Sequence, residues 1–302
     1  MGDLASSIPA ARAVAHPATV VNAMTVDVED YFHVAALAGS IDRSRWDEME
    51  YRAEGSTRRL LDLFAAADLR ATFFVLGWVA KRSPALVREI HSRGHEIASH
   101  GMSHKLVYDQ TPEEFARETY ESKALLEDII GAPVLGYRAS TYSITKRSLW
   151  ALDILKEAGF IYDSSIFPIR HDLYGIPDAP LAPARITTPK GASIVEFPMS
   201  TAPMFGARIP VSGGGYFRLL PYWLTRAGLR KLNDQLHRPF IFYLHPWEVD
   251  PQQPRVRTHW KSRLRHYTNL DRCEARLLRL VQEFRFARVR DVLTEAALLS
   301  PG

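Results

Sequence analysis

The sequence predicts an α/β fold with a largely parallel sheet or barrel. Short apolar segments alternate with amphipathic segments over most of the 302 residues, as strands and helices do in this class. The composition, 46% hydrophobic and 24% charged, is that of an ordinary globular chain. Polar residues follow the expected strands at the edge where parallel α/β folds place active sites: Asp27, His100, Arg138, Asp163 and His245.

The apolar segments predict short buried strands, with helices between them. The strands cover 19–28, 71–76, 96–98, 134–137, 160–162, 194–197 and 240–244. The helices are expected from 56 or 57 to 67, 84 to 94, 111 to about 130, 143 or 145 to 159, and over 219–236 and 277–284. Residues 168–189 are rich in Pro and Gly and predict a long surface loop.

We expect one domain over residues 19–302, preceded by a flexible tail at 1–18. The tail lacks a basic region followed by an apolar core, so a cytoplasmic location is expected. No apolar segment approaches the roughly 18 residues of a membrane span. Cys273 is the single cysteine, which excludes an intrachain disulfide and a cysteine-based zinc cluster.

Residues 249–302 form a basic C-terminal extension. Between residues 252 and 290 the sequence has eleven Lys or Arg against three acids. Such a charge excess attracts an anionic glycan, nucleic acid or a lipid surface. A solvated helix face is the favoured interpretation, and no nucleic-acid partner is expected, because the aromatic residues do not interleave as stacking platforms would.

His100 and His104 stand four residues apart. On one helical turn this spacing would put both imidazoles on the same face, which is a common half of a divalent-metal site. Two surface histidines explain the pair alone equally well. The acidic cluster that includes Asp27, upstream at a strand end, and His245, downstream at another, favour a hydrolytic metal site.

Five segments in order resemble the motifs of the polysaccharide deacetylases, the NodB-homology group of carbohydrate esterase family 4. They are Thr25–Asp30 (TVDVED), Ser99–His104 (SHGMSH), Tyr137–Tyr142 (YRASTY), Asp163–Ser165 (DSS) and Phe242–His245 (FYLH). The segments VDVEDYFHV from Val26 and GGGYFR from Gly213 look like the subgroup linked to bacterial exopolysaccharide loci. The resemblance implies an irregular (β/α) barrel of the seven-stranded type with a C-terminal helical extension. It also implies removal of N-acetyl groups from an amino-sugar-containing polysaccharide.

The resemblance makes His100 and His104 ligands of a divalent metal, with zinc expected first and cobalt, nickel or iron as alternatives. A carboxylate from the first motif completes the set. The family commonly has two adjacent aspartates there, whereas this chain offers Glu29 and Asp30. Both stay open, with Asp30 slightly preferred because its shorter side chain suits a tight site.

The resemblance also assigns the acid and base. Asp27 would be the general base, held by Arg138, and His245 would be the general acid, its ring held by Asp163. Each has a structural alternative: a helix cap or buried ion pair for Asp27, a surface salt bridge for Arg138, and a satisfied core position for His245.

Thr141 would supply a backbone N–H to the oxyanion. Ser140 stands where the family usually has Pro, which would leave this loop looser. Aromatic side chains stack on sugar faces, and core packing is an equally good interpretation of the candidates Tyr142, Tyr216, Phe217 and Trp247. Two other functions remain open: hydrolysis of a small or cyclic amide on the same fold, and carbohydrate binding without turnover. The sequence does not predict the oligomeric state.

Overall fold

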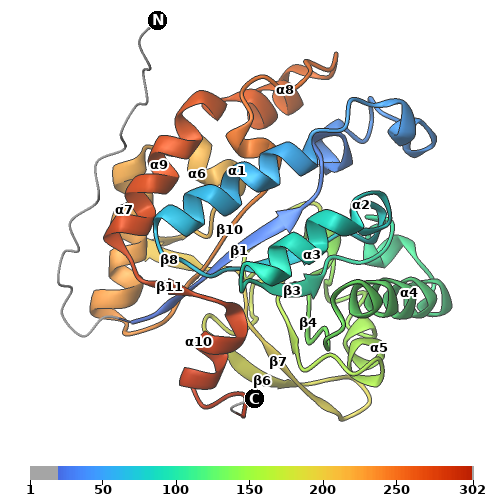
Figure 1. Ribbon diagram of the computed structural model, residues 1–302. Coiled ribbons are helices and arrows are strands. Elements are labelled where there is room, and N and C mark those ends of the chain that lie inside the picture. The colour runs from blue at the N-terminus through green and yellow to red at the C-terminus, as the bar shows by residue number, and fades with distance from the viewer. Residues whose placement is uncertain (1–19, 301–302) are drawn as a thin grey trace, which may run out of the picture.

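The computed structural model describes residues 20–300, so the tail expected at 1–18 lies outside the described residues. Seven parallel strands follow one another around one curled sheet, which confirms the α/β class and the irregular barrel (Figure 1). Their spatial order is β10 (Ile241–Leu244), β1 (Asn22–Val28), β2 (Thr72–Val75), β3 (Glu96–Ser99), β4 (Gly136–Tyr137), β5 (Tyr162–Asp163) and β7 (Ser193–Glu196). Within 20–300 we find no helix long and apolar enough to cross a membrane.

Four further strands were not predicted. β6 (Ala184–Thr187) pairs antiparallel with β7, inside the segment expected to be a surface loop. β8 (Thr201–Met204) and β9 (Ala207–Pro210) form a hairpin, and the two-residue β11 (Phe286–Ala287) pairs with β1. β6, β8 and β9 are short edge or hairpin strands with half-exposed positions, and the last two contain proline, so their sequences lack an apolar strand signal.

Most helices fall where the sequence predicts them, with α4 the clearest case. Thr111 and Glu114 form the capping box, with hydrogen bonds of 3.2 and 3.1 Å, and Gly131 ends the helix at φ 67°. α5 is shorter than expected and begins only at Ala151. The helices are α1 (Ala53–Ala66), α2 (Gly77–Arg82), α3 (Pro84–Ser92), α4 (Pro112–Ile130), α5 (Ala151–Glu157), α6 (Gly214–Leu219), α7 (Tyr222–Arg230), α8 (Trp260–Tyr267), α9 (Leu270–Glu283) and α10 (Val289–Glu295).

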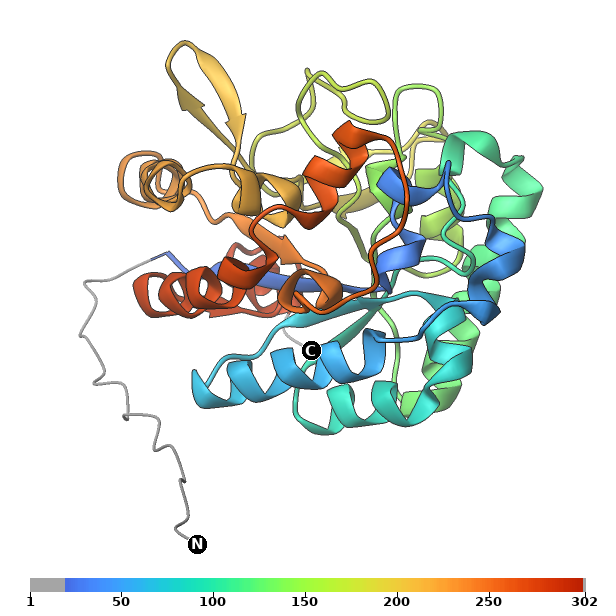
Figure 2. The ribbon, with the colours of Figure 1, turned by 90° about the horizontal axis from the view of Figure 1, so that it is seen from above.

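The curled sheet does not close, because within residues 20–300 no strand pairing joins its parallel strands β7 and β10 and β6 occupies the outer edge of β7. Residues 197–200 and 211–213 fill this gap, with Val211 N donating to Ser200 O (3.2 Å) and Tyr243 N donating to Ser212 O (2.7 Å). The β8–β9 hairpin lies between these two segments in the chain and projects from the molecule in Figure 2. A full set of parallel strands is therefore not needed to surround the interior.

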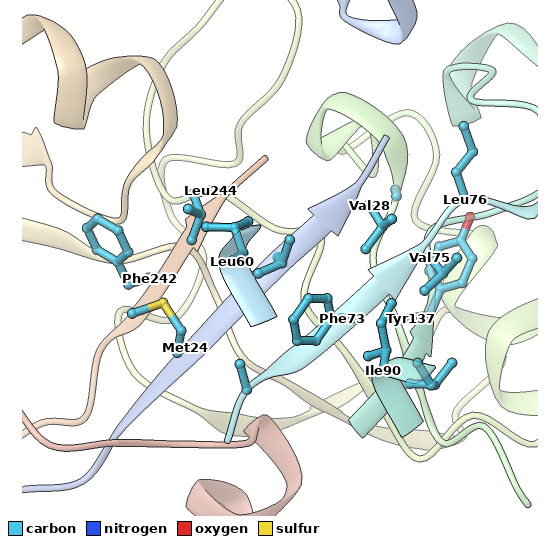
Figure 3. Packing of buried hydrophobic residues seen from close by; sticks show 14 of the residues in the cluster. Met24, Val28, Leu60, Phe73, Val75, Leu76, Ile90, Tyr137, Phe242 and Leu244 are labelled. Carbon is cyan, nitrogen blue, oxygen red and sulfur yellow. The ribbon is translucent and has the colours of Figure 1, made fainter. Parts of the chain in front are cut away.

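Successive side chains of β1 point alternately into the hydrophobic core and into the barrel interior, where the candidate site lies. Met24 and Val28 pack outward with Leu60 of α1, Phe73 and Phe242 in the main hydrophobic cluster (Figure 3). The intervening residues therefore face the interior of the barrel, because successive side chains of a strand point to opposite faces. This periodicity, readable in the sequence, directs the first acidic motif to the carboxyl end of the barrel interior.

Candidate metal and catalytic site

Glu29, His100 and His104 come together where β1 and β3 end. One ligand atom of each lies within 4.8 Å of the others, and all three side chains are buried. His104 Nε2 lies 2.6 Å from Glu29 Oε2, and His100 Nε2 lies 3.9 Å from the same oxygen. A carboxylate and two imidazoles at this spacing are a donor set typical of zinc and related divalent cations.

The two histidines lie in a loop and not on a helical turn, which corrects the geometry expected from their spacing. Gly101 and His104 adopt positive φ values of 75° and 57° and turn the chain back on itself. Arg138 O accepts a hydrogen bond from His100 Nδ1 at 2.8 Å, which leaves Nε2 free to coordinate. Burial lowers the pKa of His100 to about 4, so its ring is neutral at pH 7, as a ligand must be.

Glu29 supplies the test of whether the site fits a cation. Its Oε2 atom is buried and, among residues 20–300, receives no hydrogen bond of acceptable geometry. Burial opposes ionisation of Glu29, but His104, His245 and His100 outweigh it and lower the pKa of the carboxyl. A buried, ionised carboxylate with an open lone pair beside two imidazoles fits a divalent metal.

Asp30 is not part of this cluster, so the slight preference for it was wrong. Its Oδ1 accepts from Tyr31 N (2.8 Å), and its Oδ2 accepts from Arg52 N (2.6 Å) and Ala53 N (2.7 Å). Burial raises the pKa of Asp30 to about 6 despite these three backbone hydrogen bonds. Asp30 therefore caps a short 3-10 helix and ties the start of α1 to the end of β1.

Asp27 and Arg138 form a buried ion pair between the ends of β1 and β4. Arg138 Nη1 donates to Asp27 Oδ1 (2.7 Å) and Thr25 Oγ1 (2.8 Å), and its Nη2 donates to Ser164 Oγ (3.1 Å). Only one oxygen of Asp27 is engaged by the arginine. The other, Oδ2, lies 3.9 Å from His245 Nε2.

His245 follows β10 and is held by Glu248, three residues further along the chain. Glu248 Oε1 lies 2.7 Å from His245 Nδ1, and Arg218 Nε donates to Glu248 Oε2 at 2.7 Å. Burial disfavours the imidazolium, but Glu248, Glu29 and Asp27 outweigh it and raise the pKa of His245 to about 9. Burial likewise opposes ionisation of Glu248, and Arg218 and His245 bring its pKa down to about 2.

Asp163 does not hold His245, which corrects the expected pairing. Its carboxylate accepts from Ser165 Oγ (2.6 Å) and Ser165 N (3.2 Å), and burial raises its pKa. Ser165 Oγ in turn accepts from Ala139 N (2.8 Å), so Asp163 supports the loop after Arg138. The residue that the sequence analysis missed is Glu248. The sequence pattern that could have revealed it is His-x-x-Glu at the end of a strand, which places the glutamate within reach of the histidine ring.

The site opens into a cavity of about 160 Å³. Its walls are Asp27, Glu29, Val34, Ala35, His100, His104, Thr141, Tyr142, Tyr174, Tyr243, His245 and Trp247. Thr141 has φ 55°, and within 20–300 its N–H makes no hydrogen bond. At Ser140, the backbone carbonyl accepts a hydrogen bond from Ser143 Oγ at 2.7 Å, which joins the two ends of this turn.

Two of the four aromatic candidates, Tyr142 and Trp247, line this cavity. Trp247 is nearly buried and stacks on the His245 ring, with centroids 4.9 Å apart. Tyr216 lines a separate cavity of about 440 Å³ with Arg170 and Arg208. Phe217 is 2% exposed and packs on Phe242, so its expected sugar contact was wrong.

The fold and the donor set define a parallel α/β barrel with a buried cluster of two histidines and a carboxylate beside Asp27 and His245. The family model for polysaccharide deacetylase matches residues 45–162, and a second family model, a domain of unknown function (DUF3473), matches residues 164–294. Residues 45–162 therefore match the polysaccharide deacetylase family, whose NodB-homology group, carbohydrate esterase family 4, the five motifs resemble. One sheet takes strands from both matched regions, since β2, β3 and β4 lie in the first and β7 and β10 lie in the second.

Two curated relatives illustrate the similarity. A peptidoglycan-N-acetylglucosamine deacetylase of Bacillus cereus is 32% identical over 26% of this chain and 37% of its own length. A chitooligosaccharide deacetylase of Rhizobium leguminosarum bv. trifolii is 32% identical over 34% of this chain and 45% of its own length. The matches thus span less than half of either relative.

Solved structures extend the likeness of the fold to nearly the whole chain. A crystal structure described as a polysaccharide deacetylase from Mycobacterium smegmatis has a TM-score of 0.63 and 19% identity, and covers 98% of this chain and 97% of its own. The crystal structure of Puue allantoinase has a TM-score of 0.60 and 16% identity, and covers 93% and 92%. At these identities the likeness concerns the fold alone.

Proposed function

We propose that the protein is a metal-dependent N-deacetylase of an amino-sugar-containing polysaccharide. One observation carries the proposal. The cluster of Glu29, His100 and His104 lines the same cavity as a candidate base, Asp27, and a candidate acid, His245. His245 Nε2 lies 3.6 Å from Glu29 Oε1 and 3.9 Å from Asp27 Oδ2. The printed names of the two curated relatives, both deacetylases of glycans that carry N-acetyl groups, support this substrate class over a small cyclic amide.

Glu29, His100 and His104 would hold the metal, with zinc as the first candidate. When bound, the ion supplies a Lewis acid for the amide oxygen and acidifies the attacking water. Asp27 Oδ2 accepts the proton of that water as the water adds to the acetyl carbonyl. Arg138 holds the Asp27 carboxylate through its other oxygen, Oδ1.

His245 donates a proton to the sugar nitrogen as the C–N bond breaks, releasing acetate and a free amine. Glu248 fixes the ring through Nδ1, so that Nε2 faces the acidic residues of the cavity. The Thr141 N–H has no acceptor within residues 20–300 and lies in the cavity wall, where it stabilises the developing oxyanion. A cavity of about 160 Å³ admits the acetyl group while the polymer stays outside, against Tyr142 and the rim.

Metal removal and two carboxylate variants test the proposal. Acetate release from chitooligosaccharide should stop after chelation and return with Zn²⁺ or Co²⁺. Glu29→Gln should weaken Zn²⁺ binding at least about tenfold, whereas Asp30→Asn should change it less than about threefold, because only Glu29 faces the histidines. Calorimetric titration and thermal unfolding of both variants provide the readout. Full turnover after chelation, or loss of Zn²⁺ binding by a folded Asp30→Asn variant alone, would contradict the assignment.

We further propose that the reaction takes place in exopolysaccharide biosynthesis and that the protein acts in the cytoplasm. The biosynthetic role rests on the resemblance of the segments that begin at Val26 and Gly213 to the exopolysaccharide-linked subgroup. Deletion of the gene should raise the N-acetyl content of the secreted polymer, measured by NMR, and cell fractionation should find the protein in the cytoplasmic fraction. An unchanged polymer would remove the biosynthetic role while leaving the chemistry intact.

A further inference from the structure

α8 exposes large apolar side chains on its outer face. Trp260 is 65% exposed and Leu264 is 54% exposed, and their spacing of four residues places them on one side of the helix. Only His266 of α8 is buried. The neighbouring α9 buries most of its apolar residues (Leu270, Cys273, Leu277 and Leu280) and exposes one, Leu278, at 39%. A solvated helix face, which the sequence favoured here, requires neither of these two neighbouring apolar side chains of α8.

The segment around α8 is strongly basic. No acidic residue occurs from Pro251 to Leu270, and five exposed cations lie in this stretch: Arg255, Arg257, Lys261, Arg263 and Arg265. Nearby ion pairs use other cations, such as Arg226 and Arg279 with Glu283. In the part of the chain that the structure describes, none of the five pairs with a carboxylate. Their charge is therefore available to an external anionic surface.

α8 is fixed at the rim of the catalytic cavity. Arg218 donates to the backbone carbonyls of Arg265 (3.1 Å) and His266 (2.9 Å), and the His266 ring stacks on Trp247 at 4.4 Å. α8 also contacts the short helix 35–37, whose first residue, Ala35, lines the cavity. Figure 1 shows α8 at the outer edge of the molecule, beyond the ends of α1 and α9. The inner side of α8 is thus anchored, and its outer side has no cover from residues 20–300.

We propose that α8 and residues 255–265 bind the surface of an anionic phospholipid membrane. The five cations attract acidic headgroups, while the indole of Trp260 and the side chain of Leu264 enter the interfacial region. An acidic glycan would use the cations and the flat Trp ring, but an exposed Leu adds nothing to sugar stacking. The apolar pair therefore favours lipid. Docking through α8 would hold the catalytic cavity close to the membrane.

The test is co-sedimentation of the full-length protein with phosphatidylcholine vesicles that contain or lack phosphatidylglycerol. Wild type should bind only the anionic vesicles. Trp260→Ser with Leu264→Ser, and separately Lys261→Glu with Arg263→Glu, should each weaken binding at least about tenfold. Trp223→Ser on α7 is the matched control for an exposed aromatic, since Trp223 is 64% exposed. Arg117→Glu with Lys156→Glu, on α4 and α5, is the control for charge reversal.

Both controls should stay within about twofold of wild type, and thermal unfolding should show that all four variants are folded. No binding to anionic vesicles at low ionic strength would overturn the proposal, as would equal losses in variants and controls. Binding of polygalacturonate that the α8 variants abolish, with no vesicle binding, would assign the surface to an acidic glycan instead. The inference does not depend on the proposed deacetylation, because acetate release from a soluble oligosaccharide is measured separately.

Discussion

Two buried arginine–carboxylate pairs flank the candidate site, one from each half of the chain. Arg138 with Asp27 joins the ends of β4 and β1, and Arg218 with Glu248 joins α6 to the turn after β10. Both arginines are at most 1% exposed. The pairs look equivalent by burial and distance, yet their carboxylates are engaged differently.

Asp27 gives one oxygen to Arg138 and keeps the other directed toward His245. Glu248 has both oxygens engaged, Oε1 by His245 and Oε2 by Arg218. The first pair therefore leaves Asp27 Oδ2 available to accept a proton. The second pair has no free oxygen and only positions His245 and raises its pKa. The role of a buried carboxylate follows from how many of its oxygens the protein already uses.

The largest effect should come from Asp27→Asn, which removes the free acceptor but keeps the shape of the pair. The rate of acetate release should fall by about 10³-fold, within the range for loss of a general base. Metal content should not change, because Asp27 is outside the ligand cluster. Asp47→Asn, an exposed position whose side chain is 82% accessible, is the matched control. Activity within tenfold of wild type would show that another group takes the proton.

Glu248→Gln should have the next largest effect. Loss of the anion beside His245 should lower kcat by about 10- to 100-fold with little change in KM, since Glu248 lies behind the ring and does not line the cavity. The buried Arg218 would lose its counter-charge, which should reduce the free energy of unfolding by about 3 kcal/mol.

A second substitution separates the two consequences of Glu248→Gln. Adding Arg218→Met removes the unpaired charge, so denaturant unfolding should recover part of the lost stability while kcat stays low. Recovery of kcat together with stability would mean that Glu248 acts only on folding. Normal kcat in Glu248→Gln itself would make the Arg218–Glu248 pair purely structural and leave the role of Asp27 to its own variant.

The sequence predicted some parts of this site and missed others. The successes are patterns among residues that lie close together in the chain. The period of two along β1 put Asp27 and Glu29 on the same interior face, and the order of the motifs predicted the histidine pair. Local patterns of this kind need no knowledge of the rest of the fold. The capping box at Thr111 succeeded for the same reason.

Two of the failures involve contacts whose partners lie far apart in the sequence, and the third, Asp163, involves a local turn. Asp30 and Glu29 are both acids at a strand end, and the choice between them rests on backbone N–H groups of residues 52 and 53. Asp163 was assigned to His245 because both follow strands, but its own turn engages it first. Arg218 reaches Glu248 only after α6 folds against the turn beyond β10. Composition and spacing carry no signal for such pairings.

The smallest effect concerns His266, which lies beneath the Arg218 pair. Burial and the charge of Arg218 lower the pKa of His266 to about 3, against an unfolded value of about 6.5. The unfolded chain therefore binds a proton that the folded chain does not, so this contribution to stability is present above about pH 6.5 and is lost as the pH falls toward 3. The loss is about 1.4 kcal/mol per pH unit within that window.

His266→Asn should make the free energy of unfolding less steep between pH 6 and 4 by roughly this amount, measured by urea denaturation at several pH values. In this variant the free energy of unfolding should still rise with pH, because burial also lowers the pKa of other histidines, such as His95. The exposed His259→Asn should leave the slope at the wild-type value. Equal slopes in wild type and His266→Asn would require His266 to take up its proton in the folded state, beside Arg218. The second arginine pair would then be open to water, unlike the sealed pair at Asp27.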